Sequence, residues 1–141
     1  MWKYCRKCGK NWNYKIINNK KKNEIIGNSH VILKNDTFAI LHNNTHAILN
    51  DNSFANLYKN SSAKLWNESF AYLFSNSSAT LWNDSSAKLF HNSSAEIFYN
   101  SSILLYNNSS AELYNNSYIK LKGYKSVKLH DSNYIEKTIN Y

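Results

Sequence analysis

An eight-residue repeat is the feature of this sequence that most restricts how the chain can fold. Leucine recurs every eight residues from Leu33 to Leu129, and Ile97 replaces it once. Alanine or a larger aliphatic residue stands two positions before each leucine, and Ser or Thr stands two positions earlier still from Ser29 to Ser117. The unit reads Asn-Ser-Ser-Ala-x-Leu-aromatic-Asn and occurs about thirteen times up to about Glu136. A short tandem repeat of this kind indicates a stacked, solenoidal architecture.

The spacing within each unit predicts a short strand followed by a corner. An amphipathic helix needs apolar residues at i, i+3, i+4 and i+7, whereas here they fall at i and i+2 only. Alternate residues of a strand share one face, so the Ser, Ala and Leu of a unit point the same way. Asn tolerates the left-handed region of backbone space that a tight corner needs. The chain has 24 Asn and 19 Ser among its 141 residues, enough to supply a corner in every unit.

The outward positions indicate that two units make one coil. The residue before the alanine is aromatic in alternate units, as at Phe38, Phe54 and Phe70, and is His or Ser in the units between them, as at His46 and Ser62. Like residues two octads apart in sequence are therefore expected to stack about 4.8 Å apart. We predict an all-β, two-sided β-solenoid (a β-helix) with two octads, or about 16 residues, per coil and six to seven coils.

The repeat also divides the chain into three parts. Residues 1–28 are predicted to form a small basic N-terminal cap, residues 29–136 the solenoid, and residues 137–141 its C-terminal end. The pattern decays near the end, where Lys137 stands at a position due for a core leucine. Each coil buries two Leu, two Ala and two Ser. The inward Ser therefore needs a hydrogen-bond partner, either a neighbouring Ser or a corner backbone group.

Positive charge gathers at the two ends of the chain. The net charge is +8, of which residues 1–30 carry +7, residues 31–118 carry −2 and residues 119–141 carry +3. A protein that bound nucleic acid along its whole length would carry positive charge on the repeat itself. The candidate for contacting phosphate is therefore the basic head, which consists of Lys3, Arg6, Lys7, Lys10, Lys20, Lys21 and Lys22.

A pair of cysteines in the head is a candidate metal site. Cys5 and Cys8 are separated by two residues, a spacing that lets two thiolates bind one Zn²⁺. The chain has no further Cys, so the remaining ligands would be His30 and His46 or groups from a second chain. The segment resembles the knuckle of small zinc ribbons but lacks their second knuckle. The alternative is a degenerate half-knuckle or a free dithiol, and zinc is the one cofactor that the sequence suggests.

Aromatic residues follow most of the core leucines and are expected to point outward in two columns. One column consists of Trp66, Trp82, Phe98 and Tyr114, and the other of Tyr58, Phe74, Phe90 and Tyr106. Columns with a spacing of about 4.8 Å could bind sugar rings or an apolar partner. The alternative is that the rings stack on one another and stabilise the coil, at about 0.5–1.5 kcal/mol per pair.

The sequence predicts a protein without catalytic activity. It contains no Gly-rich phosphate loop and no recurring pair of carboxylates, and its His residues lie on the repeat rather than around a pocket. An ice-binding-like face is disfavoured because Lys64, Glu96 and Glu112 interrupt the outward pattern. No apolar run approaches the ~18 residues of a membrane span. The first residues lack the apolar core of a secretory signal, so we expect a protein of the cytoplasm or of a virion.

The octad Asn76–Asn83, read as Asn-Ser-Ser-Ala-Thr-Leu-Trp-Asn, resembles the octapeptide arrays of many phage and bacterial proteins. The resemblance covers residues 29–136, carries no catalytic residues, and implies a viral or mobile-element protein. The octapeptides of ice-nucleation proteins are similar in period but differ in motif. We therefore expect a structural or binding module that presents its aromatic and Asn/Ser columns to a protein or glycan. The alternatives are a nucleic-acid accessory protein acting through the basic head, and a homo-oligomer or filament assembled end to end.

Overall fold

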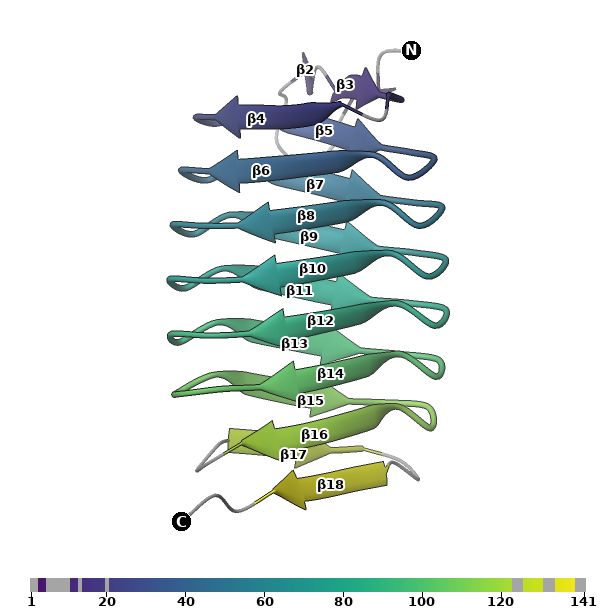
Figure 1. The fold of residues 1–141 in the computed structure, drawn as a ribbon, viewed down its shortest axis with the longest axis vertical. Coiled ribbons are helices and arrows are strands. Elements are labelled where there is room, and N and C mark those ends of the chain that lie inside the picture. The colour runs from purple at the N-terminus through teal and green to yellow at the C-terminus, as the bar shows by residue number, and fades with distance from the viewer. Residues whose placement is uncertain are drawn as a thin grey trace.

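A computed structural model describes residues 3–4, 11–12, 14–19, 21–122, 126–130 and 134–138. All regular structure in these residues is β. Two parallel sheets of eight strands stack against each other (Figure 1). A separate pair, β1 (Lys3–Tyr4) and β2 (Asn11–Trp12), is antiparallel. The prediction of an all-β, two-sided β-solenoid with two octads per coil and six to seven coils is confirmed, and the structure has about seven turns of about 16 residues each.

The first sheet, here called the odd sheet, contains the odd-numbered strands. They are β3 (Tyr14–Ile17), β5 (His30–Leu33), β7 (His46–Leu49), β9 (Ser62–Leu65), β11 (Ser78–Leu81), β13 (Ser94–Ile97), β15 (Ser110–Leu113) and β17 (Ser126–Leu129). The second, the even sheet, contains β4 (Lys22–Ile26), β6 (Phe38–His42), β8 (Phe54–Leu57), β10 (Phe70–Leu73), β12 (Ser86–Leu89), β14 (Ser102–Leu105), β16 (Tyr118–Lys122) and β18 (Tyr134–Thr138).

Paired strands lie in register, and the two residues of each pair are two octads apart in the sequence. Ser78 of β11 lies opposite Ser94 of β13, and Ala71 of β10 lies opposite Ala87 of β12. The chain thus alternates between the sheets and climbs one strand spacing per turn, with β3 and β18 at opposite ends of the rod (Figure 1). Like residues consequently form columns that run along the rod.

The core is a double column of aliphatic side chains between the sheets. The leucines from Leu33 to Leu113 and Ile97 have no exposed surface, and the alanines beside them are at most 6% exposed. The inward Ser and Thr residues from Thr37 to Ser117 are equally buried. Most of their hydroxyls donate to the carbonyl three residues back, as from Ser77 to Phe74 at 2.7 Å and from Ser85 to Trp82 at 2.6 Å. The hydrogen-bond partner of the inward Ser is therefore the corner backbone, which is one of the two partners that the sequence predicts.

Most corners between Asn35 and Asn116 place two consecutive non-glycine residues in the left-handed region, whereas the corner after β4 uses Gly27, with φ of 86°. Asn67 and Glu68 have φ of 52° and 61°, and Asn83 and Asp84 have 51° and 61°. The N–H of the second residue donates to the carbonyl of the first residue one turn later, as from Glu68 to Asn83 at 3.3 Å. The corners are thus held by backbone bonds between turns, and Asn tolerates this conformation better than most residues.

The parallel sheets extend beyond the repeat. β3 and β4 form a complete turn before Ser29, with Ile17 and Ile25 buried in the positions of the core leucines. At the other end Lys137 pairs with Leu121, in agreement with the decay read from the sequence. Leu129 is 44% exposed there. The described residues include no helix with the length and apolar character needed to cross a bilayer.

Candidate functional site

A groove of about 820 Å³ runs along the outer face of the odd sheet. Its floor is formed by alanine backbone, and its lining comes from two columns of outward side chains, one before each alanine and one after it. The first column contains His30, His46, Ser62, Ser78, Ser94, Ser110 and Ser126, and the second contains Ile48, Lys64, Thr80, Glu96, Glu112 and Lys128. The groove follows directly from the sequence, because Ser is small and occupies the same column in five successive turns.

The serine hydroxyls in the middle of the groove are available to a ligand. Ser94 is exposed and Ser78 and Ser110 are partly exposed. Within the described part of the chain, these three hydroxyls make no hydrogen bond to protein atoms. In-register pairing of Ser78, Ser94 and Ser110 spaces them one strand apart, about 4.8 Å. The column therefore offers one unused donor and acceptor per turn.

The N-terminal end of the groove carries two histidines. The rings of His30 and His46 stack with centroids 4.9 Å apart, and His46 Nδ1 lies 2.5 Å from the hydroxyl of Ser62. Burial lowers the pKa of His30, and repulsion from His46 lowers it further. The neutral form of His30 is thus favoured near pH 7. The imidazole of His46 thus lies beside the hydroxyl of Ser62.

The C-terminal end of the groove is organised around a carboxylate. Glu112 accepts hydrogen bonds from the hydroxyl of Tyr114 at 3.0 Å and from Lys128 at 3.5 Å, and its Oε2 lies 3.0 Å from His130 Nε2. These partners, His130 foremost and then Tyr114, lower the pKa of Glu112. The carboxylate is therefore ionised at neutral pH, and Lys64 supplies the opposite charge three turns earlier in the same column.

The predicted aromatic columns exist, but their rings cover one another. Trp66 and Trp82 stack at 5.1 Å, Trp82 and Phe98 at 4.2 Å, and each pair is within 7° of parallel. Phe98, Tyr114 and His130 continue this column at 4.6 and 4.2 Å. On the other side His42, Tyr58, Phe74, Phe90 and Tyr106 stack at 4.6–5.1 Å. The geometry therefore favours self-stacking over the binding of sugar rings between the aromatic faces.

The metal and basic sites predicted from the head are mostly outside the described residues. Cys5 and Cys8 lie there, as do Arg6, Lys7, Lys10 and Lys20, so zinc and nucleic-acid binding stay predictions. Lys21 and Lys22 are exposed at the first turn. His30 and His46 are neighbours, as expected. Among the described side chains, no group of three or more His, Cys, Asp or Glu is placed to hold a metal ion.

Comparisons with protein-family models, with curated proteins and with solved structures found no match for this chain. What the protein does must therefore be argued from its own surfaces.

Proposed function

We propose that the protein is a non-enzymatic binding rod whose groove on the odd sheet holds a linear glycan. The observation that carries this proposal is the column of unused serine hydroxyls, one per turn, at Ser78, Ser94 and Ser110. A glycan presents hydroxyls along its whole length, and a β-linked chain advances by about one turn of this solenoid per ring. Because successive rings of an extended β-1,4-linked chain are turned over relative to each other, every second ring can present the same hydroxyls to every second turn.

A peptide is a poorer match for the groove. An extended peptide repeats the direction of its side chains every ~6.6 Å, whereas the turns repeat every ~4.8 Å, so the two registers drift apart. The groove lies on the face of the sheet, where the backbone groups of β9, β11 and β13 already pair with each other. A peptide therefore cannot join as an additional strand there. Glu96 and Glu112 balance Lys64 and Lys128 in the same groove, which therefore offers phosphate chains no net positive charge.

The contact between His46 and Ser62 does not make this groove a hydrolase site by itself. A serine nucleophile needs a base that a third group orients. In the part of the chain that the structure describes, no carboxylate contacts His46. The pair is better explained as the polar end of the hydroxyl column.

The resemblance of the octad to phage and bacterial arrays supports a role in a phage or mobile element. A rigid rod with a glycan groove would serve a phage or mobile-element protein in contact with a host surface. A protein partner at a second surface is compatible with this role. The aromatic columns then act as stabilisers of the rod, because their faces are covered by their own neighbours.

Filling the groove should weaken glycan binding. We expect isothermal titration with soluble β-linked oligosaccharides, such as chitin, cellulose and xylan fragments, to find at least one ligand of the wild-type protein. Ser94→Trp places a bulky ring across the exposed middle of the groove and should weaken that binding by at least about tenfold, equivalent to about 1.4 kcal/mol.

Ser102→Trp is the matched control, because Ser102 occupies the same position of the octad on the even sheet. It should leave binding unchanged. The proposal is wrong if none of these oligosaccharides binds, or if the two variants weaken binding equally.

A further inference from the structure

The even sheet carries a partly exposed aromatic surface over its first turns, on the side of the rod opposite the groove. The aromatic face, as we name it, consists of Phe38, Ile40, Phe54, Phe70 and Tyr72. Phe38, Phe54 and Phe70 stack at 5.1 and 5.3 Å, and Tyr72 packs edge-on against Phe54 and Phe70 at 5.5 and 4.9 Å. All of these side chains remain partly exposed. Asn56 lies between Ile40 and Tyr72 and interrupts the patch. An apolar patch of this kind is nevertheless typical of a protein contact.

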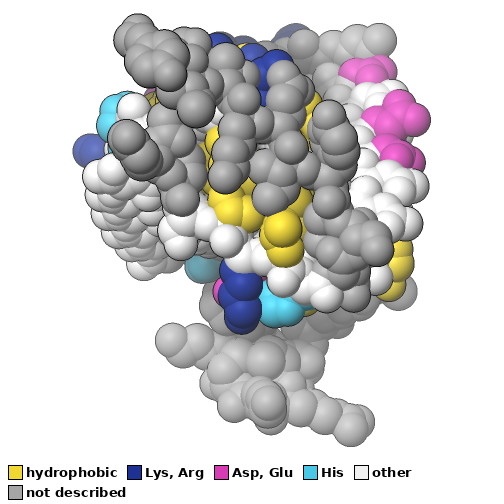
Figure 2. Space-filling model, turned by 90° about the horizontal axis from the view of Figure 1, so that it is seen from below, with side chains coloured by type: hydrophobic (Ala, Val, Ile, Leu, Met, Phe, Trp, Pro, Cys, Tyr) yellow, Lys and Arg dark blue, Asp and Glu magenta, His cyan; other side chains and the backbone are white. Residues whose placement is uncertain are grey.

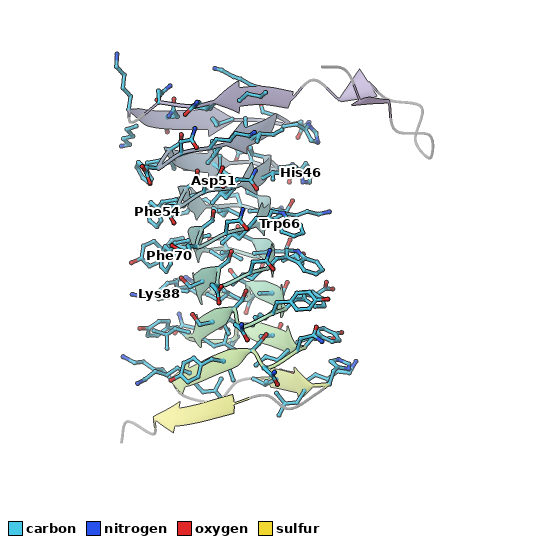
Figure 3. The ribbon with its side chains drawn as sticks, turned by 90° about the vertical axis from the view of Figure 1, so that its right-hand side faces the viewer. His46, Asp51, Phe54, Trp66, Phe70 and Lys88 are labelled. Carbon is cyan, nitrogen blue, oxygen red and sulfur yellow. The ribbon has the colours of Figure 1, made fainter. Side chains whose placement is uncertain are left out.

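A line of carboxylates borders this face. The corners that lead from the odd sheet into the even sheet carry Asp36, Asp51, Glu68 and Asp84, which we call the acidic edge. All four are exposed, and one occurs in each of four successive turns. Acidic side chains gather along one edge of the rod (Figure 2), and Asp51 lies at the corner between the Phe54 and Trp66 sides (Figure 3).

The acidic edge is notable because the chain as a whole is basic. The net charge is +8, yet the corners that lead into Phe54 and Phe70 carry Asp51 and Glu68. Screening confines such fields to about 8–10 Å at physiological ionic strength, so a docking partner meets the local charge rather than the net charge. Lys88, which lies over the ring of Tyr72 at 5.4 Å, marks where the face ends (Figure 3).

We propose that the aromatic face and acidic edge together bind an apolar segment of another protein that carries Lys or Arg along one side. The apolar residues of that segment would cover Phe54, Phe70 and Tyr72, and its cations would lie against Asp51, Glu68 and Asp84. Apolar burial supplies the affinity, while the charges at the rim set the orientation and speed association. This surface is independent of the groove, so the rod would bridge a glycan and a protein.

Fluorescence anisotropy with short synthetic peptides tests this inference. We expect a labelled peptide of alternating Leu and Lys to bind the wild-type protein, and peptides of alternating Leu and Glu or of alternating Ser and Lys to bind at least tenfold more weakly. Phe54→Ser combined with Phe70→Ser should weaken binding of the Leu-Lys peptide by about tenfold or more. Asp51→Asn combined with Glu68→Gln, which leaves the apolar contacts intact, should weaken it roughly threefold and reduce its dependence on salt.

Glu96→Gln is the matched control, because it removes an exposed carboxylate from the opposite sheet. It should leave binding of the Leu-Lys peptide unchanged. Equal binding by wild-type protein and both double variants would overturn the proposal, as would failure of the peptide to bind. A doubling of the molecular mass that Phe54→Ser abolishes would assign the face to a second copy of the chain instead. A variant that loses peptide binding but still binds oligosaccharide would show that the aromatic face and the groove act independently.

Discussion

Leu73→Ala is expected to lower the free energy of unfolding by about 2–5 kcal/mol, the largest effect of any single substitution considered for this rod. Leu73 has no exposed surface and lies in register between Leu57 and Leu89 of the neighbouring turns. Backbone hydrogen bonds join neighbouring turns along the strands and corners. The turns therefore cannot shift to fill the cavity that the missing side chain leaves. The loss of the side chain therefore leaves a cavity as well as removing buried apolar area.

Leu104→Ala is the matched control for this prediction. Leu104 belongs to the same sheet but points outward and remains partly exposed. Its removal should cost less than about 1 kcal/mol, because surface substitutions rarely cost more than a few tenths of a kcal/mol. Urea unfolding followed by circular dichroism measures both variants. Equal losses of stability would mean that Leu73 does not lie in a core between the two sheets.

Trp82→Ala is expected to lower the free energy of unfolding by about 2–3 kcal/mol and to leave oligosaccharide binding unchanged. The ring of Trp82 is stacked on both faces, against Trp66 and Phe98, and each such pair contributes about 0.5–1.5 kcal/mol beyond burial. The loss should remain below the 3–5 kcal/mol typical of core tryptophans. The ring is partly exposed, and within the described structure its buried Nε1 has no hydrogen-bond partner.

Trp66→Ala provides the comparison, because among the described residues Trp66 stacks on a single ring. It should cost less than Trp82→Ala. Thermal and urea unfolding give the stabilities, and titration below the unfolding range gives the affinity for the oligosaccharide found with the wild-type protein. Loss of binding at unchanged stability would show instead that the aromatic column contacts the ligand.

The period of the sequence was sufficient to predict the fold. The Ala-x-Leu spacing predicted the inward face, and the alternation of Phe38, Phe54 and Phe70 with His and Ser predicted two octads per turn, as observed. The turn made by β3 and β4 was harder to detect. Lys15 and Asn23 stand where the repeat has Val31 and Ala39, although Ile17 and Ile25 keep the core positions.

The candidate site was harder to predict from the sequence, because it depends on the shape of the surface. The groove arises from the difference in size between Ser78 or Ser94 and their bulkier outward neighbours, and a strand pattern alone describes each face as flat. Whether aromatic faces are free or covered depends on rotamers, and stacking at 4.2–5.1 Å became evident only in three dimensions. The acidic edge was visible as Asp36, Glu68 and Asp84 in alternate units. Its position beside the aromatic face required the corner geometry.

Every pair of octads advances the chain by one strand spacing, and distances between spin labels measure this advance. With Cys5 and Cys8 replaced by Ser, one label at residue 126 and the other at residue 62, 46 or 30 span four, five and six turns of one column. Double electron–electron resonance should give three narrow distributions whose centres increase by about 4.8 Å per step, since the underlying Cα distances are about 19, 24 and 29 Å. Three octads per turn would place residues 62 and 46 on other faces than residue 126, so the three distances would lose their constant step. That result, or broad distributions, would contradict a turn of two octads.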